Sequence, residues 1–434
     1  MNHSWKKSFG ILLVATVVSK AIGFIRELVL ASKFGVSKDF DVLLAIFAIP
    51  TTIVSLLLYA VPHIIIPRLD LNEQSESNFY RSFSEKYFWA YVLFLIGLTI
   101  FYVTSSIFYI KINSINIDGE SELNIYLVLF FGCYLFLNSI YTIFKALYNA
   151  KEKFILPAFS PLSIHISIIF SVIFFYRYGV ITFAFGLVFG SVLQLLLYFI
   201  DFKRKNILKY FRFSLKPNKL EYSSYLIIIF IELLGQSYML IDRSFLRELP
   251  EGHISAIHYA SIINNLPVTM IGMSIGTLIF PSITKFAQNG DFGKLQATLN
   301  KTLIISLIIG SSIFILFFNF GDFIISILLE RGNFGYDAVV TTSNYLSYLS
   351  VGLPFILAHI ILTKLCFALQ KEKILLLTTM CAVILKYVLS LYFVQEDFFG
   401  GLSLSTSLAF IFNVIILIGF LYKKIHYTKV FKNE

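Results

Sequence analysis

The chain has 434 residues, of which 57% are hydrophobic and only 14% are charged. A soluble domain carries about 25% charged residues, so this composition excludes a soluble globular protein and indicates a polytopic membrane protein. The net charge of +10 does not by itself indicate nucleic-acid binding, because membrane proteins concentrate Lys and Arg in their cytoplasmic loops. We therefore expect no nucleic-acid partner.

Apolar segments long enough to cross a bilayer recur along the whole chain, since a span needs about 20 mostly apolar residues. Their approximate bounds are 8–32, 41–66, 87–109, 123–148, 155–176, 179–201, 222–245, 255–282, 299–319, 338–368, 374–395 and 400–422. We predict an all-α protein with about twelve transmembrane helices, the first retained rather than removed as a signal peptide. Residues 321–330 are too few to span, so we expect them to lie at the membrane interface.

The positive charges of the predicted loops give an orientation. Most of the 35 Lys and Arg residues fall near the two ends of the chain and in the alternate loops on the same side as those ends. Cytoplasmic loops carry the excess of Lys and Arg in membrane proteins. We therefore predict that both termini are cytoplasmic.

The first predicted span carries three ionisable residues, Lys20, Arg26 and Glu27. A charge at the bilayer centre costs about 2.5–3.5 kcal/mol on the insertion scale, so such residues usually face a cavity or a partner. At helical spacing Lys20 and Glu27 share one face, and Arg26 lies on the flank of that face. The alternative is that Lys20 and Arg26 extend toward opposite headgroup layers.

Other polar residues lie in or beside later spans, where interhelical hydrogen bonds explain them about as well as substrate contact does. They are Asp41, Glu232, Arg243, Asn264 and Asn265. Cations outnumber carboxylates within the spans, which favours an anionic cargo such as phosphate or pyrophosphate. The basic residues Arg26, Lys20 and Arg243 are thus candidate pyrophosphate ligands, and the others, with Glu27, are candidate polar or gating residues of the same cavity.

A pattern of the first half recurs in the second half at a constant spacing. Its residues are Arg26, Gly35 and Pro50, then Arg243, Gly252 and Pro267. Each half holds six predicted spans, so we expect parallel repeats about an axis along the membrane normal, with the substrate site between them. The expected divisions are an N-terminal lobe over 1–202, a basic cytoplasmic linker over 203–221 and a C-terminal lobe over 222–434.

Motifs for catalysis and for cofactor binding are missing from the sequence. It contains no Walker loop, no dinucleotide fingerprint and no cluster with metal-ligand spacing. We therefore expect a transporter, not an enzyme, with no cofactor and no metal. A cation-coupled multidrug antiporter is one alternative, although it would need carboxylates facing its cavity. A membrane scaffold is another, but it does not account for the embedded cations.

Several stretches together resemble the MurJ (MviN) family of lipid II flippases, in the multidrug/oligosaccharidyl-lipid/polysaccharide exporter superfamily. The first stretch runs from Ser19 to Glu27 and continues at Gly35, Asp41 and Pro50. The others are Leu249-Pro250-Glu251-Gly252-His253-Ile254-Ser255-Ala256, Glu330-Arg331-Gly332-Asn333-Phe334 and Gly352-Leu353-Pro354. These stretches fall in both halves, and they are specific as a set rather than singly.

The resemblance implies two six-helix lobes in a V around a cationic cavity, in the bacterial inner membrane. It implies alternating access for an undecaprenyl-pyrophosphate-linked saccharide, with membrane lipids and a coupling ion or the membrane potential as further partners. By position, Arg26 matches a family arginine proposed to bind the pyrophosphate, and Asp41 matches a family Asp. Lys20 stands where a second arginine is usual, and Glu27 stands where Asp is usual.

Two segments depart from the family pattern. Thr51-Thr52-Ile53-Val54-Ser55 lacks the arginine pair that is usual after the proline, and Ser261-Ile262 replaces a usual Asp-Arg. A Wzx-like flippase for O-antigen or capsule repeat units is therefore an alternative for the same architecture.

Overall fold

The computed structural model describes residues 3–66, 69, 75–113, 121–151, 153–214 and 223–430. Within these residues the regular structure is helical, apart from one isolated bridge between Arg331 and Phe334. Backbone contacts divide the chain into two compact units, Met1–Ile229 and Phe230–Glu434. Of the predicted linker, residues 215–221 lie outside the described residues.

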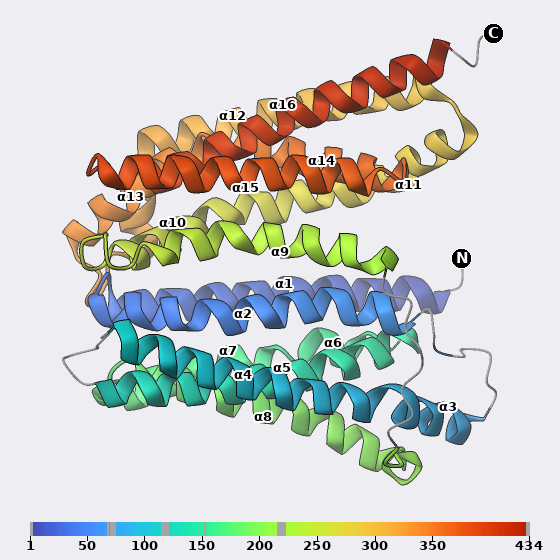
Figure 1. Ribbon diagram of the computed structural model, residues 1–434, viewed down its shortest axis with the longest axis vertical. Helices are drawn as coiled ribbons and strands as arrows, with labels where there is room; N and C mark the ends of the chain where they lie inside the picture. Colours follow the sequence, from blue (N-terminus) through green and yellow to red (C-terminus); the bar gives the residue numbers. More distant parts are fainter. Residues whose placement is uncertain are drawn as a thin grey trace. The chain divides into compact units, whose positions relative to one another are not determined.

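Unit 1 contains helices α1 to α8 (Figure 1). Their bounds are α1 His3–Phe34, α2 Lys38–Ile65, α3 Glu76–Phe83, α4 Trp89–Asn113, α5 Ser121–Ala150, α6 Ile155–Phe159, α7 Leu162–Phe175 and α8 Ile181–Arg204, with a π turn η2 (Ser84–Phe88) and the 3-10 turns η3 (Tyr176–Tyr178) and η4 (Leu208–Tyr210). Helix α5 packs against α2, α4 and α8, and α7 packs against α1 and α8. Apolar side chains of α5 and α8, among them Phe144 and Tyr198, form a buried aromatic core between these helices.

Unit 2 begins within α9, at Phe230, and contains helices α10 to α16 (Figure 1). Their bounds are α9 Ser223–Ser244, α10 His253–Pro267, α11 Met273–Asn289, α12 Phe292–Leu329, α13 Tyr336–Ser350, α14 Leu353–Ala368, α15 Glu372–Gln395 and α16 Gly401–Val430, with a π turn η5 (Val268–Gly272). The α13–α14 segment packs against α10, α11, α12 and α16, and α15 packs against α16. The two units share a packing pattern when their membrane spans are numbered one to six in chain order. In each unit the fourth span packs against the second, third and sixth spans, and the fifth span packs against the sixth.

The helices coincide with the predicted apolar segments. Nine helical segments of the described chain are long and apolar enough to cross a membrane, and the pair α13 and α14, bent by 48°, makes a tenth. Helices α1 and α9 occupy the two remaining segments, the first and seventh of the predicted spans. The fold class expected from the sequence, an all-α polytopic membrane protein, is therefore confirmed.

Prolines account for the main breaks inside the spans. Pro161 stands between α6 and α7, Pro267 is the last residue of α10 before the π turn η5, and Pro354 lies in the first turn of α14 after the bend. A proline lacks the backbone N–H that would continue the helical ladder, which favours a bend or an end of the helix at these three positions.

Two helix pairs approach so closely that only glycine fits between them. A Cβ built on Gly190 of α8 would lie 2.5 Å from the Cα atom of Ile164 on α7, and one on Gly186 would lie 2.8 Å from that of Ile168. A Cβ on Gly310 of α12 would lie 2.4 Å from the Cα atom of Pro354. Small residues four apart let the backbones of membrane helices meet, and the Gly186–Gly190 pair has this spacing.

The expected interfacial segment over 321–330 forms the end of α12. Helix α12 continues through it to Leu329, across a kink at Phe320, where φ is −122° and ψ is 20°. Beyond the kink Gly321 is buried, and Asp322 accepts a hydrogen bond from Ser343 of α13. The segment's position at the membrane interface stays a prediction.

Candidate functional site

Arg26 lies on α1 with its guanidinium against α7. Its Nη1 atom lies 3.2 Å from Nδ1 of His165, and its Nη2 atom donates to the carboxylate of Glu27. Its Nε atom is buried and has no hydrogen-bond partner among the described residues. The side chain is still 23% exposed. A guanidinium offers five N–H donors, so this one keeps donors for a further anion.

The other candidate residues of unit 1 differ in burial. Glu27 is buried in its ion pair with Arg26, whereas Lys20 is exposed at an earlier turn of α1. Asp41 is buried in the first turn of α2, where the positive end of the helix dipole favours a carboxylate. The structure thus joins Arg26 to Glu27, and it leaves Lys20 accessible.

Unit 2 contains a cavity of about 350 Å³ between α9, α10, α13, α14 and α16. Three candidate residues, Arg243, Asn264 and Asn265, belong to its wall. The Oδ1 atom of Asn264 is buried and has no hydrogen-bond partner among the described residues. The rest of the wall is mostly apolar, so the cavity combines a few polar groups with apolar surface, as small-molecule sites do.

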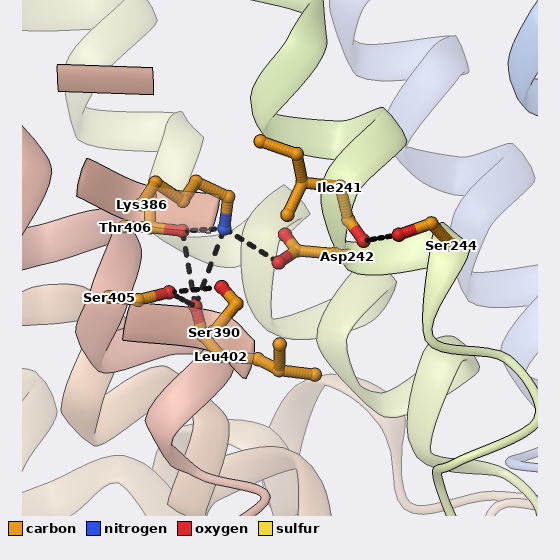
Figure 2. A network of polar contacts seen from close by, with 8 residues as sticks. All are labelled: Ile241, Asp242, Ser244, Lys386, Ser390, Leu402, Ser405 and Thr406. Atoms are coloured by element: carbon orange, nitrogen blue, oxygen red, sulfur yellow. Dashed lines mark hydrogen bonds and ion pairs between the residues drawn. The ribbon is translucent and has the colours of Figure 1, made fainter. Parts of the chain in front are cut away.

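A buried ion pair stands in the same wall. The Nζ atom of Lys386, on α15, lies 2.6 Å from Oδ1 of Asp242 on α9 and 2.6 Å from Oγ1 of Thr406 on α16 (Figure 2). Lys386 is fully buried, whereas Asp242 and Thr406 line the cavity. Removing one partner of a buried pair typically costs about 3–5 kcal/mol, because the other charge is left uncompensated.

Glu232 takes a local role. It accepts a hydrogen bond of 3.0 Å from Nε2 of Gln236, one turn further along α9. The described cavity wall starts at Gly235, and Glu232 is not among the residues that line it. The candidate residues of unit 2 thus divide into three at the cavity and one beside it.

Sequence reasoning did not single out Lys386 as a site residue. One signal was present: Lys386 and Asp242 are opposite charges in segments that are otherwise apolar, and an embedded charge needs a partner. The sequence does not say which embedded cation meets which carboxylate, because that depends on how each helix is rotated. His165 of α7 was not singled out either, and it is the residue that meets Arg26.

Comparison with known proteins gives one family along nearly the whole chain. A family model described as "Lipid II flippase MurJ" matches residues 30–432. A protein of Buchnera aphidicola, "Probable lipid II flippase MurJ", is 26% identical over 429 residues, covering 94% of this chain and 82% of the relative. A protein of the same name from Borreliella burgdorferi is 27% identical over 420 residues, covering 94% and 81%.

Solved structures show the same architecture. A structure described as "Lipid II flippase MurJ, inward closed conformation" superposes with a TM-score of 0.76 at 19% identity, covering 96% of this chain and 90% of that one. An inward-facing multidrug transporter of the MATE family superposes with a TM-score of 0.66 at 10% identity, covering 96% and 98%. At these identities the likeness shows the fold.

Proposed function

Because this chain belongs to the lipid II flippase MurJ family, we propose that it moves lipid II, an undecaprenyl-pyrophosphate-linked saccharide, from the inner to the outer leaflet. The family expected from the sequence motifs is thereby confirmed. The observation that carries the proposal is the match over residues 30–432, which includes both units rather than one motif. The family is one of transporters in the bacterial inner membrane, and this chain is a multi-pass membrane protein.

The alternatives are less well supported. The curated relatives carry the lipid II name, including the "Lipid II flippase MurJ" of Burkholderia cenocepacia, which is 23% identical over 419 residues. The multidrug transporters match in fold at lower TM-scores. A substrate other than lipid II, such as an O-antigen or capsule unit, rests only on the two departures from the family pattern, at 51–55 and 261–262.

We infer that Arg26 contributes to pyrophosphate binding. Its partly exposed guanidinium has N–H donors for a phosphate oxygen, and a guanidinium can hold two such oxygens at once. Lys20 and Arg243 are proposed to add positive charge along the path. Glu27, buried beside Arg26, fixes the orientation of that guanidinium.

The proposal is tested by reconstituting the full chain into vesicles that contain lipid II. We expect the wild type to equilibrate lipid II between leaflets, as measured by its accessibility to an impermeant reagent. Arg26→Ala is expected to reduce the rate at least tenfold at equal insertion. The matched control is Arg81→Ala, because Arg81 is an exposed arginine of α3 paired to Glu85 at 2.9 Å. If the wild type does not move lipid II but does move another lipid-linked saccharide, the assignment of lipid II as the substrate is wrong.

A further inference from the structure

The ammonium of Lys386 is surrounded by oxygen atoms. Besides Asp242 and Thr406 at 2.6 Å, the main-chain oxygen of Leu402 lies 3.5 Å from Nζ. The three oxygens come from α9 and α16, and the lysine reaches them from α15 (Figure 2). A lysine ammonium has three N–H donors and no acceptor, so these oxygens match its donor count.

These oxygens are also of the kind that bind metal cations. Carboxylate and carbonyl oxygens are the ligands that hard cations prefer, and a hydroxyl oxygen has lone pairs to add. An ammonium ion and an alkali cation carry the same single charge, so either one balances the charge of Asp242. Asp242 and Thr406 line the cavity of unit 2, so the oxygen cluster is open to that cavity on one side.

We propose that Lys386 is a built-in cation that fills a monovalent cation site formed by Asp242, Thr406 and the Leu402 carbonyl. The wild-type protein then takes up no ion at this cluster, since the ammonium already occupies it. When the lysine is shortened, the buried carboxylate is left without its counter-charge. A small monovalent cation such as ammonium or sodium is then expected to enter from the cavity.

The Lys386 ammonium also holds α9 against α15 and α16. That helix meets α16 through Tyr238, which stacks on Phe410 with ring centroids 5.0 Å apart, and the Lys386 ammonium lies 5.9 Å from the Tyr238 ring centroid. The ion pair with Asp242 adds a contact to α15 one turn further along. Filling of the site therefore stabilises the packing of α9 in unit 2, and thermal stability reports on it.

The test is thermal unfolding of the full chain in detergent, in sodium, ammonium and choline chloride at equal ionic strength. A ligand that binds only the folded state raises the unfolding temperature with its concentration. Lys386→Ala is expected to unfold earlier than wild type and to recover several degrees in sodium or ammonium, but not in choline. The matched control is Lys364→Ala, since Lys364 is a lysine of α14 that contacts Phe280 instead. Adding Asp242→Asn to Lys386→Ala is expected to remove the recovery.

Two results would overturn the proposal. One is a Lys386→Ala protein that responds equally to the three salts, which would mean that the cluster holds no cation once vacated. The other needs no lysine variant: selective stabilisation of the wild type by sodium or ammonium, lost in Asp242→Asn, would show that Lys386 does not occupy the site. The second measurement still decides if Lys386→Ala fails to fold.

Discussion

Arg26 combines charge with a shape that lysine does not have. Its two terminal nitrogens are engaged by His165 and Glu27, while Nε is left over. A lysine would keep the charge but offer a point donor rather than a planar fork. Variants of Arg26 can therefore distinguish two contributions to transport: the positive charge on the transport path and the geometry of the hydrogen bonds to the phosphate.

We expect Arg26→Lys to retain part of the flipping activity and Arg26→Gln to retain none. The reason is that the lysine keeps attraction to a pyrophosphate but loses the bidentate grip. The measurement is the initial rate of lipid II translocation in vesicles at matched protein density. Equal rates for Arg26→Lys and wild type would show that only charge matters at this position.

Embedded charges could be found from the sequence, but their partners could not. Lys20, Arg26 and Arg243 stand out because lipid does not tolerate isolated charges. The pairing of Lys386 with Asp242 joins α15 to α9, which are far apart in the chain. This pairing depends on how each helix is rotated about its axis. A segment that is apolar on all sides, because it faces both lipid and protein, does not indicate that rotation.

At the scale of helices, the sequence predicted the spans well. A run of about 20 apolar residues can only be a helix in a bilayer, because every backbone group must be satisfied internally. Proline then marks most bends, as at Pro161 and Pro354. The kink at Phe320 has no such signal, and there the predicted and observed lengths of α12 differ.

The close approach of α7 and α8 gives a prediction about packing. A side chain at Gly190 would meet the Ile164 backbone at 2.5 Å, and backbone cannot rotate away as a side chain can. We expect Gly190→Leu to destabilise unit 1 by at least the 1–3 kcal/mol that is roughly typical of overpacking. The measurement is the unfolding temperature in detergent.

Gly97 of α4 supplies the control, since a Cβ there would meet nothing within 4 Å. Gly97→Leu is expected to unfold at the wild-type temperature. If the two leucine variants unfold together, the close helix contact is not what limits stability.

For the whole molecule, the distribution of positive charge predicts its orientation. We expect a cysteine placed at Lys209 to react only from the cytoplasmic side and one placed at Glu396 only from the outer side. The reason is the positive-inside rule, by which loops rich in Lys and Arg lie in the cytoplasm. Both positions are exposed. The accessible side of each position is measured by labelling with an impermeant maleimide, in cells and in inverted vesicles. The labelled protein lacks the three native cysteines. Labelling of both from one side would contradict twelve spans between cytoplasmic termini.

The embedded cations also predict a dependence on voltage. One elementary charge moved through 100 mV is worth about 2.3 kcal/mol. An inside-negative potential is expected to favour the empty carrier facing the cytoplasm, and bound pyrophosphate should offset part of the charge. We therefore expect lipid II flipping in vesicles to slow when an ionophore collapses the potential. An unchanged rate would exclude the potential as the driving force.

The π turn η5 changes how this chain should be aligned with its relatives. A π turn holds one residue more than an α turn, so α11 is rotated by roughly 100° from where an uninterrupted helix after Pro267 would place it. A relative with a regular helix here would need a single-residue gap within 268–272. Without that gap, every residue of α11 would be aligned with a residue on a different face of the relative's helix. A lipid-facing apolar residue would then be compared with a cavity-facing polar one, although neither position had changed.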